Sequence, residues 1–140
     1  MDDALSVYAL CGVVLFGKMF ALSCYQGYYR LRFRAFVNAE DAAVFNRAAH
    51  TAERPEVIRA ARAWANDLEN IPWFFALSGL ALALGEDGAA TAWLSLVFTG
   101  ARILHTLAYL GAVQPWRTLF YGIGIACLLG FCVLITTAVS

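Results

Sequence analysis

The chain has 140 residues, of which 61% are hydrophobic and only 14% are charged. This composition lies outside the usual range of soluble domains and indicates an integral membrane protein. The formal net charge is zero, which excludes the strongly basic character of most nucleic-acid-binding domains, so no nucleic acid is expected as a partner. The length allows one domain, residues 1–140, and no Gly-, Ser- or Pro-rich linker divides it.

Three segments reach the roughly 20 mostly apolar residues that a membrane-spanning helix needs. The first covers about residues 5–29 and contains Lys18. Another covers about residues 89–110 and carries Arg102 and His105, and the last covers about residues 119–139 without a charge. These three segments are predicted to cross the bilayer as helices.

A further apolar segment, residues 71–84, is too short to cross alone and is closed by the turn sequence GEDG at 85–88. To reach the required length its helix must begin upstream, near Pro55 or Ile58. We therefore predict a fourth span over residues 58–84, and with it an all-α, integral membrane four-helix bundle.

This upstream extension brings polar residues to membrane depth. With 3.6 residues per turn they lie along one stripe of the helix, which contains Arg59, Arg62, Asn66, Glu69 and Trp73. A polar group facing lipid costs several kcal/mol, so the stripe is predicted to face the bundle interior or a water-filled pocket. Lys18 is predicted to pair with Asp67 or Glu69, or to extend to the membrane surface.

Basic residues are concentrated in one connecting region, since seven of the ten lie between residues 30 and 62. The positive-inside rule then predicts a cytoplasmic loop over about residues 30–57, with both termini on the opposite side. The cysteines all lie inside apolar runs and are predicted to be small buried hydrophobes: Cys11, Cys24, Cys127 and Cys132. No Cys or His spacing predicts a metal site.

Polar residues at helical spacing are expected to converge on the cytoplasmic side of the bundle. They comprise Gln26, Arg30, Arg59, Arg62, Asn66, Glu69, Arg102, His105, Tyr109, Arg117, Thr118 and Tyr121. Guanidinium groups bind carboxylates in bidentate pairs, so this cluster favours a small anionic ligand with several carboxylates. Two plainer interpretations stay open: the charges could be salt bridges between helices, and His105 alone is more often structural than catalytic.

Two stretches resemble the MAPEG family, the membrane-associated proteins of eicosanoid and glutathione metabolism: ERPEVIRAARAWANDLENIPWF at 53–74 and GARILHTLAYL at 100–110. Residues 18–42 and the stretch QPWRTLFY at 114–121 are similar to the branch that holds microsomal glutathione transferase and microsomal prostaglandin E synthase. The resemblance implies a four-helix membrane bundle that assembles as a homotrimer. It also implies glutathione bound between subunits near the cytoplasmic face.

Matched by motif, the residues implied to bind glutathione are Arg30, Arg62, Asn66, Glu69, His105, Tyr109, Arg117 and Tyr121. The resemblance places Arg117 beside the glutathione sulfur, with Thr118 and Tyr121 as the other candidate catalytic residues. Arg59 and Arg102 are expected to support the same pocket. A guanidinium near the thiol would favour the thiolate, the nucleophilic form.

The implied activity is that of a glutathione S-transferase whose thiolate attacks a lipophilic electrophile, or a lipid hydroperoxide in a peroxidase reaction, delivered from the bilayer. Departures from the family pattern disfavour prostaglandin isomerisation: Ala65 and Thr118 replace an arginine and a serine, and no arginine precedes Pro115. The alternatives are a prostaglandin-synthase-like isomerase and a non-catalytic lipid-binding or scaffold member of the family. A ligand-free structural protein would leave the arginines unexplained.

Overall fold

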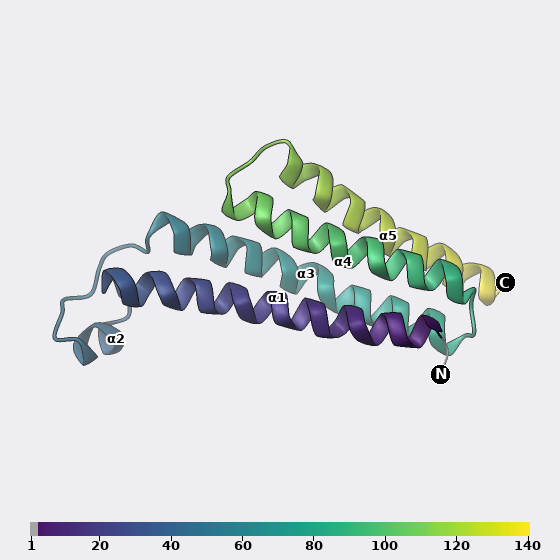
Figure 1. Cartoon of the computed structure of the whole chain (residues 1–140), viewed down its shortest axis with the longest axis horizontal. Coiled ribbons are helices and arrows are strands. Elements are labelled where there is room, and N and C mark those ends of the chain that lie inside the picture. The colour runs from purple at the N-terminus through teal and green to yellow at the C-terminus, as the bar shows by residue number, and fades with distance from the viewer. Residues whose placement is uncertain (1–2) are drawn as a thin grey trace.

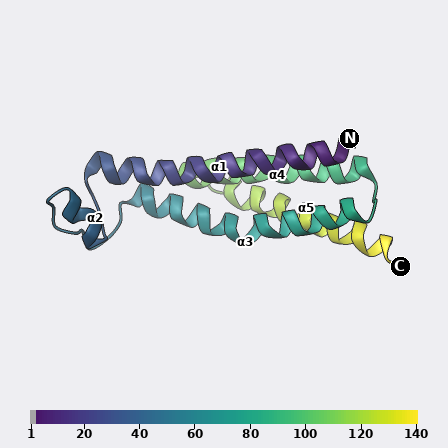
Figure 2. The same ribbon diagram turned by 90° about the horizontal axis from the view of Figure 1, so that it is seen from below.

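The computed structural model describes residues 3–140, and within them every regular element is a helix (Figure 1). The elements are α1 (Asp3–Phe33), α2 (Ala39–Val44), α3 (Pro55–Ala83), α4 (Gly88–Leu110) and α5 (Trp116–Ala138). The four long helices lie side by side, while the short α2 lies beyond one end of the bundle (Figures 1 and 2). The α4–α5 connection is at the α2 end, and the C-terminus and the start of α1 are at the other. The predicted all-α fold is therefore confirmed.

The ends of the helices follow local sequence signals. α3 begins at Pro55, a few residues before the predicted span, because proline suits the first turn of a helix, where no backbone donor is needed. Asp87 caps α4, since its Oδ1 accepts hydrogen bonds from the backbone N–H groups of Ala89 (2.9 Å) and Ala90 (3.3 Å). Gly85 adopts a φ of 72° in the α3–α4 turn, a conformation that glycine tolerates best.

Three of the long helices, α1, α4 and α5, are long and apolar enough to cross a membrane. α3 has 29 residues and runs alongside them (Figures 1 and 2), but its N-terminal half is rich in charged residues. Its role as a fourth span therefore stays a prediction. The bundle exterior is apolar, as lipid contact requires: Val13, Phe16 and Leu129 are at least 60% exposed.

Helices α3 and α4 form the centre of the bundle, because each packs against the other and against both α1 and α5. Their contact is built on Phe74 and Phe98, whose fully buried rings stack with centroids 4.7 Å apart. Phe131 of α5 packs edge-on against Phe74 at 6.1 Å. This aromatic core lies toward the end of the bundle that holds the C-terminus, and it leaves the polar residues of α3 and α4 at the α2 end.

The cysteines follow the prediction in part. Cys11 and Cys127 are buried in the core, and Cys132 is half-buried. Cys24 is exposed on α1, so the prediction of a buried hydrophobe is wrong at that position. Its side chain lies on the outer face of an apolar helix, away from the core of the protomer.

Candidate functional site

A polar pocket of about 260 Å³ lies where the C-terminal part of α4 meets the first turns of α5. Three helices line it, through Asn66 of α3, His105 and Tyr109 of α4, and Arg117, Thr118 and Tyr121 of α5. The first turn of α5 adds the positive end of a helix dipole, which favours an anion. The structure thus brings together six of the residues singled out in the sequence.

Arg117 is held over the Tyr109 ring, with its guanidinium carbon 4.6 Å from the ring centroid. The Gln114 amide is best oriented with its oxygen toward Arg117, where it accepts hydrogen bonds from Nη2 (2.5 Å) and Nε (3.1 Å). In this orientation the amide nitrogen donates to Thr118 Oγ1 at 3.2 Å. Among the residues that the structure describes no carboxylate lines the pocket, so the guanidinium charge is available to an anionic ligand.

His105 is almost fully buried, with 2% of its surface exposed, and its Nδ1 atom has no hydrogen-bond partner in the described part of the chain. Its ring packs against Tyr109 and Tyr121, with centroid distances of 5.6 Å and 6.3 Å. Buried polar side-chain atoms are normally hydrogen-bonded, so an unpaired ring nitrogen beside a pocket indicates a place for a polar ligand or for water. His105 therefore lies among the residues that line the pocket.

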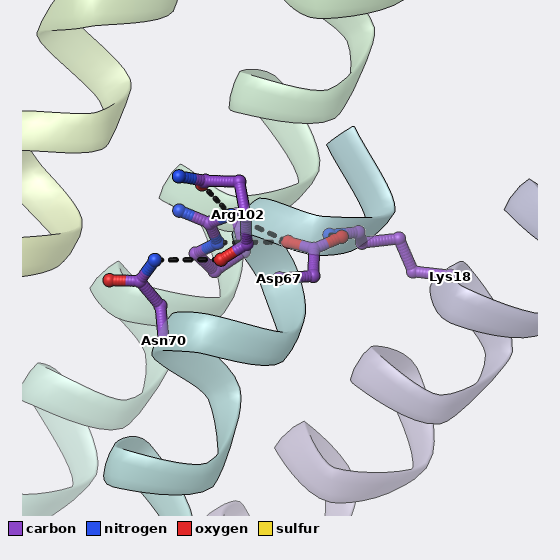
Figure 3. A network of polar contacts seen from close by, with 5 residues as sticks. Lys18, Asp67, Asn70 and Arg102 are labelled. Atoms are coloured by element: carbon purple, nitrogen blue, oxygen red, sulfur yellow. Dashed lines mark hydrogen bonds and ion pairs between the residues drawn. The ribbon is translucent and has the colours of Figure 1, made fainter. Parts of the chain in front are cut away.

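A buried ion network lies beside the pocket and joins α1, α3 and α4 (Figure 3). Asp67, fully buried, accepts hydrogen bonds at Oδ1 from Arg102 Nε (3.1 Å) and Nη2 (2.6 Å), and its Oδ2 pairs with Lys18. Arg102 Nη2 also donates to Asn66 Oδ1 at 2.6 Å. Asn70 Nδ2 donates to the backbone carbonyl of Asn66 at 2.7 Å. Of the alternatives predicted for Lys18, pairing with Asp67 is the one found.

The polar stripe of α3 was predicted to face the bundle interior or a water-filled pocket; it does not face the interior of the protomer, and among its residues Asn66 lines the pocket. Arg62 and Glu69 are exposed on the outer face of α3, and Asn66 and Arg59 are half-buried. The face that packs inside includes Ala60, Ala63, Asp67, Asn70 and Phe74, one residue further along the helix. The physical reason is that Asp67 on this face meets buried cations from two neighbouring helices, whereas Arg62 and Glu69 find no partner within residues 3–140.

Arg30 also lies outside the pocket. It is half-buried near the end of α1, and its Nε (2.8 Å) and Nη2 (2.5 Å) donate to Glu53 Oε1. Arg30, Arg62 and Glu69 are therefore not brought to the pocket within one protomer. In contrast, Asp67 was predicted from the sequence only as a candidate partner of Lys18. Its spacing of four and seven residues from Ala63 and Phe74 was the signal that it belongs to the buried face.

Together, the helical bundle, its three candidate spans and its apolar exterior define an all-helical integral membrane protein with a polar pocket between helices. The sequence matches the MAPEG family over residues 8–137, so the chain belongs to this family. The resemblance inferred from the motifs is confirmed.

Similar proteins carry two different names. The chain is 38% identical over 122 residues to a prostaglandin E synthase of Homo sapiens, a match that covers 86% of this chain and 80% of that protein. It is 36% identical over 131 residues to microsomal glutathione S-transferase 1 of Homo sapiens, covering 88% and 83%. The prostaglandin E synthase of Mus musculus is 38% identical over 114 residues, covering 81% and 74%. Both kinds of protein in the branch predicted from the motifs are thus represented.

Proposed function

We propose that this protein is a membrane-bound glutathione S-transferase that uses glutathione as co-substrate. The observation that carries the proposal is the pocket in which Arg117 lies beside Tyr109 with no carboxylate among its lining residues. Glutathione offers a thiol, two carboxylates and an ammonium group. The lining side chains supply a cation and several hydrogen-bond donors. The His105 Nδ1 atom, which is unpaired within residues 3–140, is available for a hydrogen bond to the ligand.

The pocket of one protomer is smaller than a complete ligand site, because sites for small molecules usually measure about 300–1,000 Å³. We propose that it holds the thiol end of glutathione and that a second copy of the chain completes the site. Arg62 and Glu69 support this assignment, since they are exposed on the outer face of α3 and form no ion pair with the described part of their own protomer. In a homotrimer these residues, with Arg30, would bind the carboxylates and the ammonium group at the subunit boundary.

The same proposal includes α3 as the fourth span and residues 1–140 as a single membrane domain. α3 packs against α1, α4 and α5, which are the candidate spans, and its buried charges are paired inside the bundle. The predicted cytoplasmic position of residues 30–57 would place the pocket near the cytoplasmic face. Glutathione would then enter from the cytosol, and the lipophilic substrate from the bilayer.

In the proposed mechanism the thiol loses its proton to water and Arg117 stabilises the resulting thiolate. A thiol has an ordinary pKa of about 8.5, so an adjacent guanidinium is needed to make the thiolate abundant at neutral pH. Tyr121 and Thr118 would donate hydrogen bonds to the sulfur. The thiolate forms a carbon–sulfur bond with the electrophile, and the leaving group departs with the electron pair of its own bond to that carbon.

With a lipid hydroperoxide the thiolate would instead attack the O–O bond. The distal oxygen is transferred to sulfur as a sulfenic acid, and the lipid leaves as an alkoxide that is protonated to the alcohol. A second glutathione then reduces the sulfenic acid and gives glutathione disulfide and water. The peroxidase reaction therefore consumes two glutathione molecules for each hydroperoxide, which separates it from conjugation in a product assay.

A second candidate function, prostaglandin endoperoxide isomerisation, is supported by the relatives named prostaglandin E synthase. Three positions favour transfer instead: Ala65 and Thr118 depart from that branch, and Gln114 rather than an arginine precedes Pro115. Gln114 lies against Arg117, so this departure falls beside the proposed reacting atoms. The non-catalytic alternative is disfavoured because Arg117 is present.

The test is calorimetric titration of the detergent-purified protein with glutathione, followed by ultraviolet absorbance of the bound thiolate. We expect saturable binding, a thiolate signal at neutral pH, and faster conjugation of a chlorinated nitroaromatic or reduction of a lipid hydroperoxide than isomerisation of a prostaglandin endoperoxide. Arg47→Ala, an exposed arginine outside the pocket, is the control variant. Absence of binding would refute the proposal, and the reverse substrate ranking would favour the isomerase.

A further inference from the structure

Lys18 lies outside the pocket, yet it belongs to the ion network that adjoins it (Figure 3). It projects from the middle of α1, and its side chain is 9% exposed. Its partner is Oδ2 of Asp67, while the other carboxylate oxygen binds Arg102. Burying a lysine at membrane depth costs free energy, so we expect Lys18 to have a function within the network.

The charges of the network do not balance. Lys18 and Arg102 carry two positive charges and Asp67 carries one negative charge. Within residues 3–140 no second carboxylate forms an ion pair with either cation. Without Lys18 the Asp67–Arg102 pair would be neutral, so the surplus positive charge is the one that Lys18 adds.

The network is connected to the pocket through one side chain. Because Lys18 occupies Oδ2, Arg102 approaches Asp67 Oδ1, and its Nη2 also reaches Asn66 Oδ1 at 2.6 Å. The Asn66 carboxamide therefore has its oxygen occupied by a cation, which leaves its Nδ2 group as the donor available to a ligand. Asn66 is one of the residues that line the pocket.

The groups that face the pocket are neutral or positive on every side. α4 contributes His105 and Tyr109, and α5 contributes Arg117 and Tyr121. Arg102 lies three residues before His105 on α4 and donates to Asn66, which lines the pocket, so the charges of the network lie next to the pocket wall. An anion in this pocket would supply the negative charge that the network lacks.

We propose that the surplus positive charge of the Lys18–Asp67–Arg102 network is balanced by the glutathione thiolate in the adjoining pocket, which makes Lys18 a positioning residue acting through Asp67 and Arg102. This inference rests on the proposed function, since it assumes that the anion is a thiolate. It assigns a function to a residue that does not touch the ligand. It also explains why a membrane helix retains a buried lysine.

The test is Lys18→Met, which removes the charge and keeps an unbranched side chain. In this variant the thiolate loses a stabilising charge, so the protonated thiol becomes relatively more stable. The pKa of the bound thiol should therefore rise by about one unit. At pH values well below the wild-type pKa this is about a tenfold smaller thiolate fraction. The midpoint of the pH–rate profile should move upward by the same amount, and the rate should recover at alkaline pH.

Three controls separate this effect from structural damage. Lys18→Arg keeps the charge and should keep the wild-type midpoint, whereas Lys18→Gln should repeat the shift seen with Lys18→Met. S-methylglutathione, which cannot form a thiolate, should bind the wild type and Lys18→Met with similar affinity. A purely structural role would instead lower the rate by the same factor at every pH and weaken binding of both ligands.

An unshifted midpoint in both neutral variants would overturn the inference, even if the rate falls. Failure of the proposed function has a different signature, because the wild type itself would then show no bound thiolate. Should Lys18→Met not fold, Lys18→Gln carries the same comparison with a polar side chain. The two measurements needed are the thiolate absorbance as a function of pH and the pH–rate profile of conjugation.

Discussion

Replacing Asp67 by Asn should destabilise the protein more than any other single neutralisation in the ion network. Asp67 is fully buried and is the carboxylate that both Lys18 and Arg102 share. Asn has almost the same shape but no charge, so two buried cations would be left facing each other. Removing one partner of a buried ion pair costs about 3–5 kcal/mol. This is a large share of the roughly 5–15 kcal/mol that holds a typical protein folded.

The assay is thermal unfolding in detergent, in which Asp67→Asn should lower Tm by about 10 °C or more. Lys18→Met is the matched control, because it removes one charge from the same network and leaves a neutral Asp67–Arg102 pair. Its stability should stay within about 1 kcal/mol of the wild type. Combining both substitutions leaves only the Arg102 charge and should recover part of the loss. Equal Tm values for Asp67→Asn and Lys18→Met would refute the charge-counting argument.

Three further predictions concern ligand binding and topology. Arg117→Ala should lower kcat by about a hundredfold or more while keeping most of the glutathione affinity. Steady-state kinetics measures the first and calorimetry the second. Full turnover would instead assign stabilisation of the thiolate to Tyr109 or Tyr121. Glu69→Ala should weaken glutathione binding and trimer formation without lowering protomer stability, because Glu69 is exposed in the protomer. An unchanged trimer in native mass spectrometry, together with unchanged glutathione affinity, would contradict this. A reporter fused after Asn46 should be cytoplasmic and one at the C-terminus should be on the opposite side, and the reverse pattern would exclude the proposed topology.

The sequence alone was sufficient to predict the long helices and most of the pocket. Apolar length and local signals such as Pro55 and the Asp87 cap determine where a membrane helix can begin and end, and these signals depend on neighbouring residues only. The motifs around His105 and Arg117 also lie on consecutive helices joined by a short connection. Their side chains are therefore expected to lie close together at one end of the bundle.

The orientation of α3 was decided by tertiary structure. Residues 59, 62, 66 and 69 form one polar stripe, and residues 60, 63, 67 and 70 form another about 100° around the helix. Both contain polar groups, and although the spacing of Asp67 from Ala63 and Phe74 indicates the buried face, helical periodicity does not show which cations meet its carboxylate. The choice depends on Lys18 and Arg102, which lie 49 and 35 residues from Asp67 in the chain and meet it only when α1 and α4 pack against α3. A buried carboxylate is stable only where cations surround it, and that condition exists only in the assembled bundle.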